Sequence, residues 1–421
     1  MRIARFLLLA VVGTAWIAPD TSACPFCSSQ GQTLSGEVTQ ADLIVLGSMT
    51  NARRDPNDFT KGETTFVIDN IIKPHEYLSG KKTLTIPRYV EPPTDGTKFL
   101  VFASLYARPE EFPMSAVASS AILGNPAFSQ LDPYRGEAVK PDSKLPEYLK
   151  GAIAVRQKDA VSKLRYFFEY LDAPELVVGA DALTEYGNAD YKDVRTLAKT
   201  LPAGKIVKWL KDPNTPPSRF GLYGLFLGHC GTKDDAKAVR AVLDDPARLY
   251  SSGLDGMLAA YVMLDKPTGW AYVMDILKDP KKEFPIRYAG LKVLRFFWEF
   301  RPDLVSKEEI LVGMRHLIEQ SDMADLPIED LRKWGSWDQM GYVLQFAGKE
   351  SHNKIPIIRR AILRFALSAP ATDKEAAAYV EQARKADPER VKDVEQLLKD
   401  EQPKTPASAQ QPAATPPGGG S

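Results

Sequence analysis

The chain has 421 residues, with 54 basic and 54 acidic side chains, so its formal net charge is zero. This balance argues against a protein that binds nucleic acid or an acidic membrane surface, because both need a basic surface. Hydrophobic residues make up 44% and charged residues 26% of the chain, a mixture typical of globular proteins of about two or three domains.

Residues 1–23 have the composition of a secretory signal peptide. Arg2 and Arg5 give a positively charged start, residues 6–17 are continuously apolar, and a run of small residues ends at Ala23. The apolar run is shorter than the roughly 18 residues that a membrane-spanning helix needs. We therefore expect cleavage after Ala23 and an exported protein, located in a periplasm, at a cell surface or outside the cell.

Cleavage at this point makes Cys24 the first residue of the mature chain, within the sequence Cys24-Pro-Phe-Cys27. In an oxidising compartment the two cysteines are candidates for a local disulfide. Two other interpretations stay open. A lipid on Cys24 would anchor the protein to a membrane, and a redox-active pair would share the spacing of thioredoxin-type motifs. Covalent haem is excluded, since Ser28 stands where that motif needs a histidine.

Between residues 42 and 103 the hydrophobic pattern has a period of two, which is typical of β-strands. Short apolar or alternating segments occupy residues 43–46, 64–69, 83–86 and 99–102, and turn-forming residues separate them. Short strands at this spacing predict a small antiparallel barrel or sandwich within residues 24–105.

This region resembles a known family. Cysteines at the mature N-terminus, then Ala41-Asp-Leu-Ile-Val-Leu-Gly47 and Gly96-Thr-Lys-Phe-Leu-Val-Phe102, are similar to the netrin-like domain. The resemblance implies a five-stranded OB-type barrel, which the tissue inhibitors of metalloproteinases share. It also implies an inhibitory role, in which the free amine and carbonyl of Cys24 chelate the zinc of a protease.

The rest of the chain divides into three stretches. Residues 106–150 contain six prolines and little periodicity, which predicts a proline-rich linker or loops that pack on the barrel. Residues 151–400 have the helical period of 3.6 throughout. Residues 401–421 contain five prolines and no apolar run, so we expect a disordered Pro/Ala/Gly tail.

Three segments of the helical stretch are alike when they are aligned on an arginine, and these arginines are 68 and 72 residues apart. A proline that opens a helix, and a small residue where two helices touch, are typical of a stacked helical repeat. Such an array presents an extended surface and no single deep pocket. The aligned residues are Pro217, Arg219 and Gly221; Pro285, Arg287 and Ala289; and Pro356, Arg359 and Ala361.

Residues 155–400 resemble HEAT-type repeats, an α-α superhelix of about seven helix pairs at this length. Arg219, Arg287 and Arg359 match the arginine that this family places near the start of its second helix. The resemblance implies that each arginine is structural and bonds a neighbouring loop or an acidic residue. We therefore expect a small antiparallel barrel followed by a HEAT-like solenoid.

The sequence contains no motif that names a reaction. The four histidines, His75, His229, His316 and His352, have no His or Cys at metal-ligand spacing, and we expect no metal and no cofactor. His229 and Cys230 are adjacent, but neighbouring side chains on a helix diverge by about 100°. Cys230 is therefore interpreted as a buried structural cysteine.

Two tryptophans are candidates for a recognition surface. Trp334 and Trp337 flank Gly335-Ser336 in an expected loop, where they would form an exposed patch. Trp298 lies in an aromatic run and is expected in the core.

Together these patterns predict an exported scaffold without catalytic activity that binds another protein. It would contact a membrane only if Cys24 carries a lipid. The alternatives are a lipid-anchored surface protein, a thiol–disulfide redox protein that uses Cys24 and Cys27, and an inhibitor that acts through Cys24.

Overall fold

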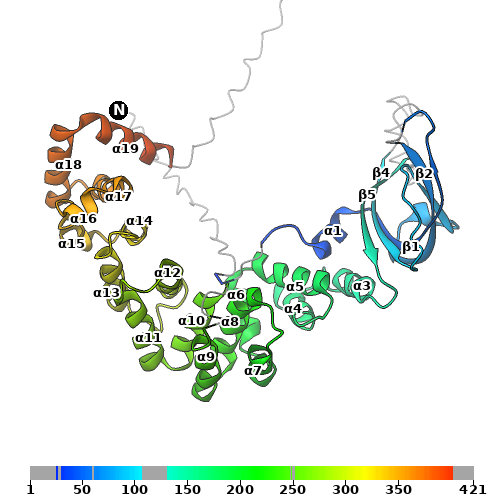
Figure 1. Ribbon diagram of the computed structural model, residues 1–421, viewed down its shortest axis with the longest axis horizontal. Helices are drawn as coiled ribbons and strands as arrows, with labels where there is room; N and C mark the ends of the chain where they lie inside the picture. Colours follow the sequence, from blue (N-terminus) through cyan, green and yellow to red (C-terminus); the bar gives the residue numbers. More distant parts are fainter. Residues whose placement is uncertain are drawn as a thin grey trace, which may run out of the picture. The chain divides into compact units, whose positions relative to one another are not determined.

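The structure, a computed structural model, describes residues 25–26, 30–58, 61–106, 130–246, 248 and 252–401. A five-stranded antiparallel sheet is followed by a long helical region (Figure 1). The chain divides into two compact units, Met1–Ala260 and Tyr261–Ser421. The first unit holds the whole sheet together with the first helices of the helical region.

The strands are hydrogen-bonded in the order β3-β2-β1-β4-β5. The four segments predicted as strands lie within β1 to β4. The fifth strand lies inside the stretch expected to be a linker or loops, where Pro133 and alternating charged residues hide its pattern. The bounds are β1 Leu43–Arg54, β2 Gly62–Lys73, β3 Thr83–Ile86, β4 Lys98–Tyr106 and β5 Gln130–Val139.

One face of the sheet carries an apolar core. Phe66 of β2, Leu84 of β3 and Val101 of β4 belong to one buried cluster, as the strand period of two requires. The sheet is open, and β3 and β5 are its two edges. Arg88, which follows β3, donates a hydrogen bond of 3.1 Å to the carbonyl of Pro133 in β5. This contact links the two edge regions of the sheet.

Most of the helices are short and amphipathic, although α8 is buried on all sides over residues 220–227. Several begin at an aspartate or serine whose side chain accepts a main-chain N–H of the first turn, as Asp159 and Ser306 do. In the first unit they are α1 Leu34–Gln40, α3 Leu145–Val155, α4 Ala160–Phe168, α5 Leu176–Asn188, α6 Tyr191–Ala198, α7 Ala203–Lys211, α8 Phe220–Cys230 and α9 Ala236–Leu243. Helix α10, Leu254–Leu264, begins in the first unit and ends in the second.

The second unit continues with α11 Lys266–Lys278, α12 Phe284–Phe300, α13 Lys307–Ile318, α14 Asp325–Trp334, α15 Met340–Leu344, α16 Glu350–Asn353, α17 Pro356–Ser368, α18 Lys374–Ala386 and α19 Pro388–Asp400. The part of the chain that the structure describes also contains four single turns of 3-10 helix: η1 Glu76–Leu78, η3 Pro217–Arg219, η4 Lys233–Asp235 and η5 Trp337–Gln339. None of the helices in the described ranges is long and apolar enough to cross a membrane.

Glycines allow α8 and α10 to approach each other closely. A Cβ atom on Gly256 would lie 2.3 Å from the carbonyl oxygen of Gly221, and one on Gly224 would lie 2.8 Å from the carbonyl oxygen of Gly256. A Cβ atom on Gly221 would also lie 2.5 Å from the carbonyl oxygen of Phe26, whose side chain is buried. Phe26 therefore packs on the same helix contact.

Helix α5 holds the first turn of α1. Asp181 accepts hydrogen bonds from the main-chain N–H of Leu34 at 2.6 Å and of Ser35 at 3.2 Å, and from the Tyr148 hydroxyl at 2.8 Å. The Ser35 hydroxyl lies 2.6 Å from Glu185, one turn further along α5. Negative charge is favourable at the N-terminus of a helix, so these carboxylates fix the start of α1.

The sheet holds the opposite end of α1. The Lys73 ammonium, from β2, donates hydrogen bonds to the carbonyls of Val38, at 2.7 Å, and Ala41. Burial lowers the pKa of Lys73, and the positive charge of Arg156 lowers it further. Because carboxylates hold one end of α1 and an ammonium holds the other, α1 joins the sheet to the helices of the first unit.

We expect Asp181→Asn to lower the free energy of unfolding of the full chain by about 2 kcal/mol, because a buried charged acceptor loses several hydrogen bonds. Chemical denaturation monitored by circular dichroism measures this loss. Asp234→Asn is the control, because the Asp234 side chain is 93% exposed and its loss should change stability by less than about 0.5 kcal/mol. Equal effects of the two substitutions would show that Asp181 does not hold α1.

Ion pairs connect the helices of the second unit. Arg295 of α12 bonds Asp330 of α14 at 2.7 Å, and Arg364 of α17 bonds Glu329 of α14 at 2.8 Å. Glu401, directly after α19, contacts Arg364 as well. Burial alone would raise the pKa of Glu401, but its hydrogen bond to Arg364 and the charges of Arg332 and Arg364 lower it. Charged side chains thus connect α14 to both α12 and α17.

Candidate functional site

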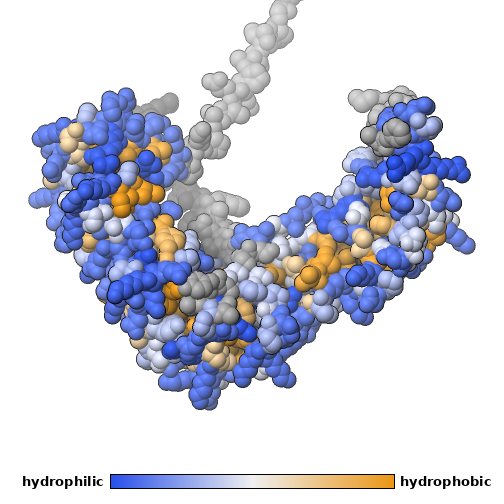
Figure 2. Space-filling model, in the orientation of Figure 1, coloured by the Kyte–Doolittle hydropathy of each residue, from blue (hydrophilic) through white to orange (hydrophobic). Residues whose placement is uncertain are grey.

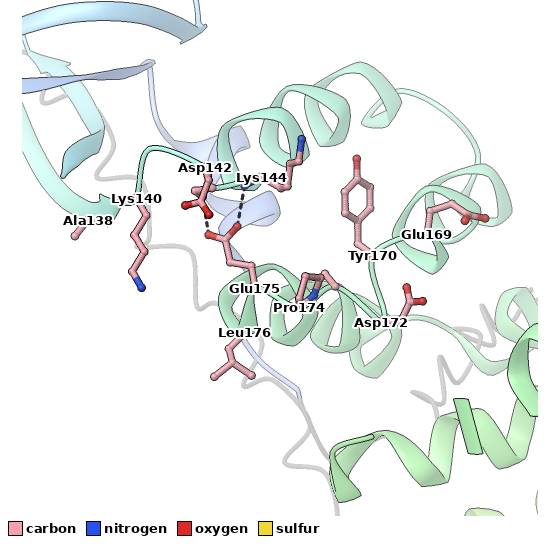
Figure 3. A pocket seen from close by; sticks show the side chains of 12 residues that line it. Ala138, Lys140, Asp142, Lys144, Glu169, Tyr170, Asp172, Pro174, Glu175 and Leu176 are labelled. Atoms are coloured by element: carbon pink, nitrogen blue, oxygen red, sulfur yellow. Dashed lines mark hydrogen bonds between the residues drawn. The ribbon is translucent and has the colours of Figure 1, made fainter. Parts of the chain in front are cut away.

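A pocket of about 770 Å³ lies in the first unit, and we call it the α5 pocket (Figure 3). Its walls come from the end of β5, from the loop that precedes α3, and from the loop that joins α4 to α5. The loop before α3 contributes Lys140, Asp142 and Lys144. The α4–α5 loop contributes residues 169–170 and 172–175, and Leu176 is the first residue of α5. The pocket is broad and open, so it is closer to an exposed surface than to an enclosed cavity.

Aromatic side chains support one wall of this pocket. Tyr170 packs edge-on against Tyr148, with 4.9 Å between ring centroids, and its ring centroid lies 5.0 Å from that of Tyr166. Burial raises the pKa values of Tyr148 and Tyr166 well above the ordinary range. These tyrosines therefore stay neutral at physiological pH and give the wall a fixed shape.

Glu175 holds the loop that precedes α3. Its carboxylate accepts hydrogen bonds from the Ser143 hydroxyl at 2.6 Å and from the main-chain N–H of Lys144 at 2.8 Å (Figure 3). Lys144 is the residue before α3, so Glu175 supplies the negative charge that the start of this helix favours. The carboxylate thus joins the two loops that form the pocket.

Two further carboxylates of the pocket, those of Asp172 and Glu169, are bonded to side chains of α7. Asp172 accepts a hydrogen bond of 2.8 Å from the indole N–H of Trp209 on α7, and Glu169 forms an ion pair of 3.0 Å with Lys205. The Lys205 ammonium lies 5.0 Å from the ring centroids of Phe168 and Trp209. These bonds position the carboxylates of Asp172 and Glu169.

The most exposed apolar side chain of the pocket is Leu176, the first residue of α5. It is 75% exposed, and it follows Pro174, which is exposed as well. Figure 3 shows Leu176 and Lys140 on one side of Pro174, and Tyr170 and Asp172 on the other. Apolar patches also interrupt the mainly hydrophilic surface elsewhere (Figure 2). The α5 pocket therefore combines an apolar surface with fixed carboxylates.

Within the described ranges, no group of three or more His, Cys, Asp or Glu side chains has the arrangement of a metal site. His229 and His352 illustrate the local roles of the histidines. His229 Nε2 lies 3.1 Å from the Tyr191 hydroxyl, and His352 Nε2 lies 2.8 Å from the carbonyl oxygen of Ile318.

The three arginines of the repeat alignment contact different partners. Arg287 is buried, and it bonds the carbonyl of Lys282 at 2.7 Å, the side-chain oxygen of Gln320 at 2.7 Å and a carboxylate oxygen of Asp322 at 2.9 Å. Gln320 and Asp322 belong to the connection between α13 and α14. Arg287 therefore ties the start of α12 to the next helix pair.

Arg219 is buried and reaches α5, since a Cβ atom on Gly179 would lie 2.4 Å from its guanidinium. Arg359 is half-buried and lies near Tyr379 of α18, whose pKa is raised by burial and lowered in part by the charges of Arg390 and Arg359. The three arginines thus occupy similar sequence positions but do not share one bonding pattern.

The prolines and small residues of the alignment lie at helix starts and helix contacts. The prolines are in the first turns of η3, α12 and α17, and the small residues are buried in α8, α12 and α17. They are Pro217, Pro285 and Pro356, and Gly221, Ala289 and Ala361.

Trp298, Trp334 and Trp337 are half-buried and belong to two aromatic pairs. Trp298 and Trp334 lie parallel, with 4.1 Å between ring centroids, and the Lys307 ammonium lies 4.7 Å from the Trp298 centroid. Trp337 packs against Phe365 at 5.2 Å. Trp298 is thus less buried than a core residue, and Trp334 and Trp337 expose less surface than an open patch would.

Cys24 and Cys27, the candidates for a disulfide, lie outside the described residues. Cys230 is half-buried at the end of α8. Burial raises the pKa of its thiol to about 11, and the charge of Asp235 adds to the shift. The thiol is therefore protonated at neutral pH and has little of the thiolate that makes cysteines reactive.

We expect iodoacetamide at pH 8 to modify Cys230 about 100-fold more slowly in the folded protein than in urea, because the raised pKa lowers the thiolate fraction by about that factor. Peptide mass spectrometry over a time course measures both rates. Equal rates in the two conditions would contradict burial of this thiol.

The α5 pocket was not predicted from the sequence. Asp172 bonds a tryptophan 37 residues away, and Glu175 bonds a serine 32 residues away, so no local pattern marks either carboxylate. The one local signal is Leu176 after Pro174-Glu175, an apolar residue that opens a helix. Comparison of the chain with models of known protein families, with curated proteins and with solved structures gives no match.

Proposed function

We propose that the protein is an exported scaffold without catalytic activity, and that it binds another protein through the α5 pocket. One observation carries this proposal. Glu169, Asp172 and Glu175 are held by bonds within the protein, while Leu176 beside them is 75% exposed. An arrangement of fixed polar groups around an exposed apolar side chain suits recognition of a partner surface.

Export is inferred from residues 1–23, whose charged start, apolar run and small residues are typical of a signal peptide. We infer further that the helical region is a HEAT-like solenoid and that the sheet is an OB-type barrel of the netrin-like kind. The bonds from Arg287 to the following connection support the first inference. The link from Arg88 to Pro133 supports the second.

A second feature supports a role in binding. Helix α5 already recognises a segment of the protein's own chain by its main-chain groups. The Asn188 side chain accepts a hydrogen bond from the Gly31 N–H at 3.0 Å and donates one to the Gly31 carbonyl at 2.7 Å. Asp181, also on α5, accepts hydrogen bonds from the main-chain N–H groups of Leu34 and Ser35. The helical region can thus bind a peptide segment through short polar side chains.

Photo-cross-linking in the cells that make the protein tests this function. We replace Leu176 by the photoreactive residue p-benzoylphenylalanine, which the exposed position accommodates. Irradiation should give an adduct of discrete mass with one partner protein. Val312, which is 44% exposed on α13 in the second unit, is the matched control position. An adduct that forms equally from position 312, or no adduct from position 176, contradicts the proposal.

A further inference from the structure

We infer that the partner segment bound in the α5 pocket carries a lysine or arginine close to an aliphatic side chain. This inference rests on the proposed function, and it names the chemistry of the partner. The basic group would bind beside Tyr170 and Asp172, and the aliphatic group would cover Leu176. The argument depends on the charge of the pocket and on the position of its apolar surface.

Two carboxylates of the pocket are bonded to neutral groups alone. Asp172 bonds the neutral indole N–H of Trp209, and Glu175 bonds a hydroxyl and a main-chain N–H. Neither forms an ion pair within the described residues. Only Glu169 is neutralised in this way, by Lys205. Asp142, on the opposite loop, is exposed and adds a further negative charge.

Two lysines also line the pocket, but among the described residues neither forms an ion pair with Asp172. Lys144 forms an ion pair of 3.6 Å with Glu147, and both side chains are 73% exposed. Lys140 lies on the far side of Pro174 from Asp172 (Figure 3). The side of the pocket that holds Tyr170, Glu169 and Asp172 therefore has an excess of acid, which favours a cationic side chain and disfavours a carboxylate.

Tyr170 adds a second source of attraction for a cation. Its ring lies on the same side of Pro174 as Asp172, and its packing against Tyr148 and Tyr166 fixes its orientation (Figure 3). A lysine or arginine near such a ring gains a cation–π interaction in addition to the ion pair. The protein contains an example, since the Lys205 ammonium forms an ion pair with Glu169 and lies 5.0 Å from the ring centroids of Phe168 and Trp209.

Leu176 and Pro174 supply the exposed apolar surface that the aliphatic side chain of the partner would cover. Covering an exposed leucine removes apolar surface from water, which favours an aliphatic partner side chain. Because Leu176 and Asp172 lie on opposite sides of Pro174, one partner segment must contact both sides. A segment that is only basic, or only apolar, would make favourable contacts on one side of Pro174 but not on the other.

Fluorescence anisotropy with three labelled peptides tests this inference on the full chain. The peptides repeat Lys-Leu-Gly, Glu-Leu-Gly or Lys-Ser-Gly four times. We expect the first to bind at least about tenfold more tightly than the other two, because each of these lacks either the charge or the apolar group. Leu176→Ser and Asp172→Asn should each weaken binding of the first peptide by about tenfold.

Two control variants separate the pocket from the rest of the surface. Val312→Ser removes an exposed apolar side chain in the second unit, and Asp234→Asn removes an exposed carboxylate of η4. Both should bind the first peptide as tightly as the unaltered chain. Equal affinity for the three peptides, or equal loss in the control variants, overturns the inference. If the cross-link from position 176 is nevertheless found, the scaffold function stands and only the partner chemistry is wrong.

Discussion

Gly256→Ala is expected to lower the free energy of unfolding by about 3 kcal/mol or more, because its new methyl group meets main-chain atoms that cannot move aside. The added carbon would lie 2.3 Å from the carbonyl oxygen and 2.6 Å from the Cα of Gly221. Overpacking of this kind typically costs about 1–3 kcal/mol, and more where the backbone must shift. Denaturation of the full chain in urea, monitored by circular dichroism, measures the loss.

Gly204→Ala is the matched control. Gly204 lies in α7. Apart from its chain neighbours and the backbone of its own helix, no heavy atom of the described residues lies within 4 Å of the position that its Cβ would take. Alanine is a better helix former than glycine, so this variant should be unchanged or more stable by up to about 1 kcal/mol. If Gly256→Ala behaves like Gly204→Ala, then α8 and α10 do not pack through their glycines.

Arg287→Ala should also lower the free energy of unfolding by about 3 kcal/mol. It removes a buried guanidinium and leaves the Gln320 side-chain oxygen and the Lys282 carbonyl without their hydrogen-bond donor. Thermal and urea denaturation of the full chain measure this effect. Arg360→Ala is the control. Arg360 is an exposed arginine of α17, and its loss should change the free energy of unfolding by less than about 0.5 kcal/mol. Similar losses in the two variants would contradict a structural role for Arg287.

The ion pair between Arg287 and Asp322 predicts that the stability of the fold depends on pH. The hydrogen bond from Arg287 is the main cause that lowers the pKa of Asp322, and the guanidinium charge adds to it. A carboxylate with a lowered pKa stabilises the fold above its unfolded pKa, about 3.9, and this contribution is lost as the pH falls through the lower folded value. Unfolding measured from pH 6 to pH 2 should therefore show an acid loss of stability that Arg287→Ala reduces. An unchanged acid profile in the variant would contradict this role.

The elements were predictable where a local pattern determines them. The alternation in residues 83–86 predicts β3, and the prolines before Arg287 and Arg359 predict the starts of α12 and α17. The strand β5 has no such pattern. Pro133 and Gly136 weaken its strand propensity, and its pairing with β4 depends on residues more than 20 positions away.

The functional residues were less predictable than the elements, because their roles depend on partners distant in the sequence. Asp322 lies 35 residues after Arg287, and only the repeat alignment suggested a partner in the neighbouring connection. Trp209 and Asp172 belong to no shared pattern at all. The half-buried state of Trp334 likewise follows from its stacking on Trp298, 36 residues earlier, which the sequence of the loop does not indicate.

Recovery of the native protein with its cross-linked neighbours tests the proposed scaffold function most directly. The unaltered chain, Leu176→Ser and Val312→Ser are each cross-linked in the producing cells, purified and compared by quantitative mass spectrometry. We expect one neighbour at a constant ratio with the unaltered chain and with Val312→Ser, and a decrease of about tenfold with Leu176→Ser. Equal recovery from all three chains, or no neighbour at a constant ratio, would contradict a function in protein binding through the α5 pocket.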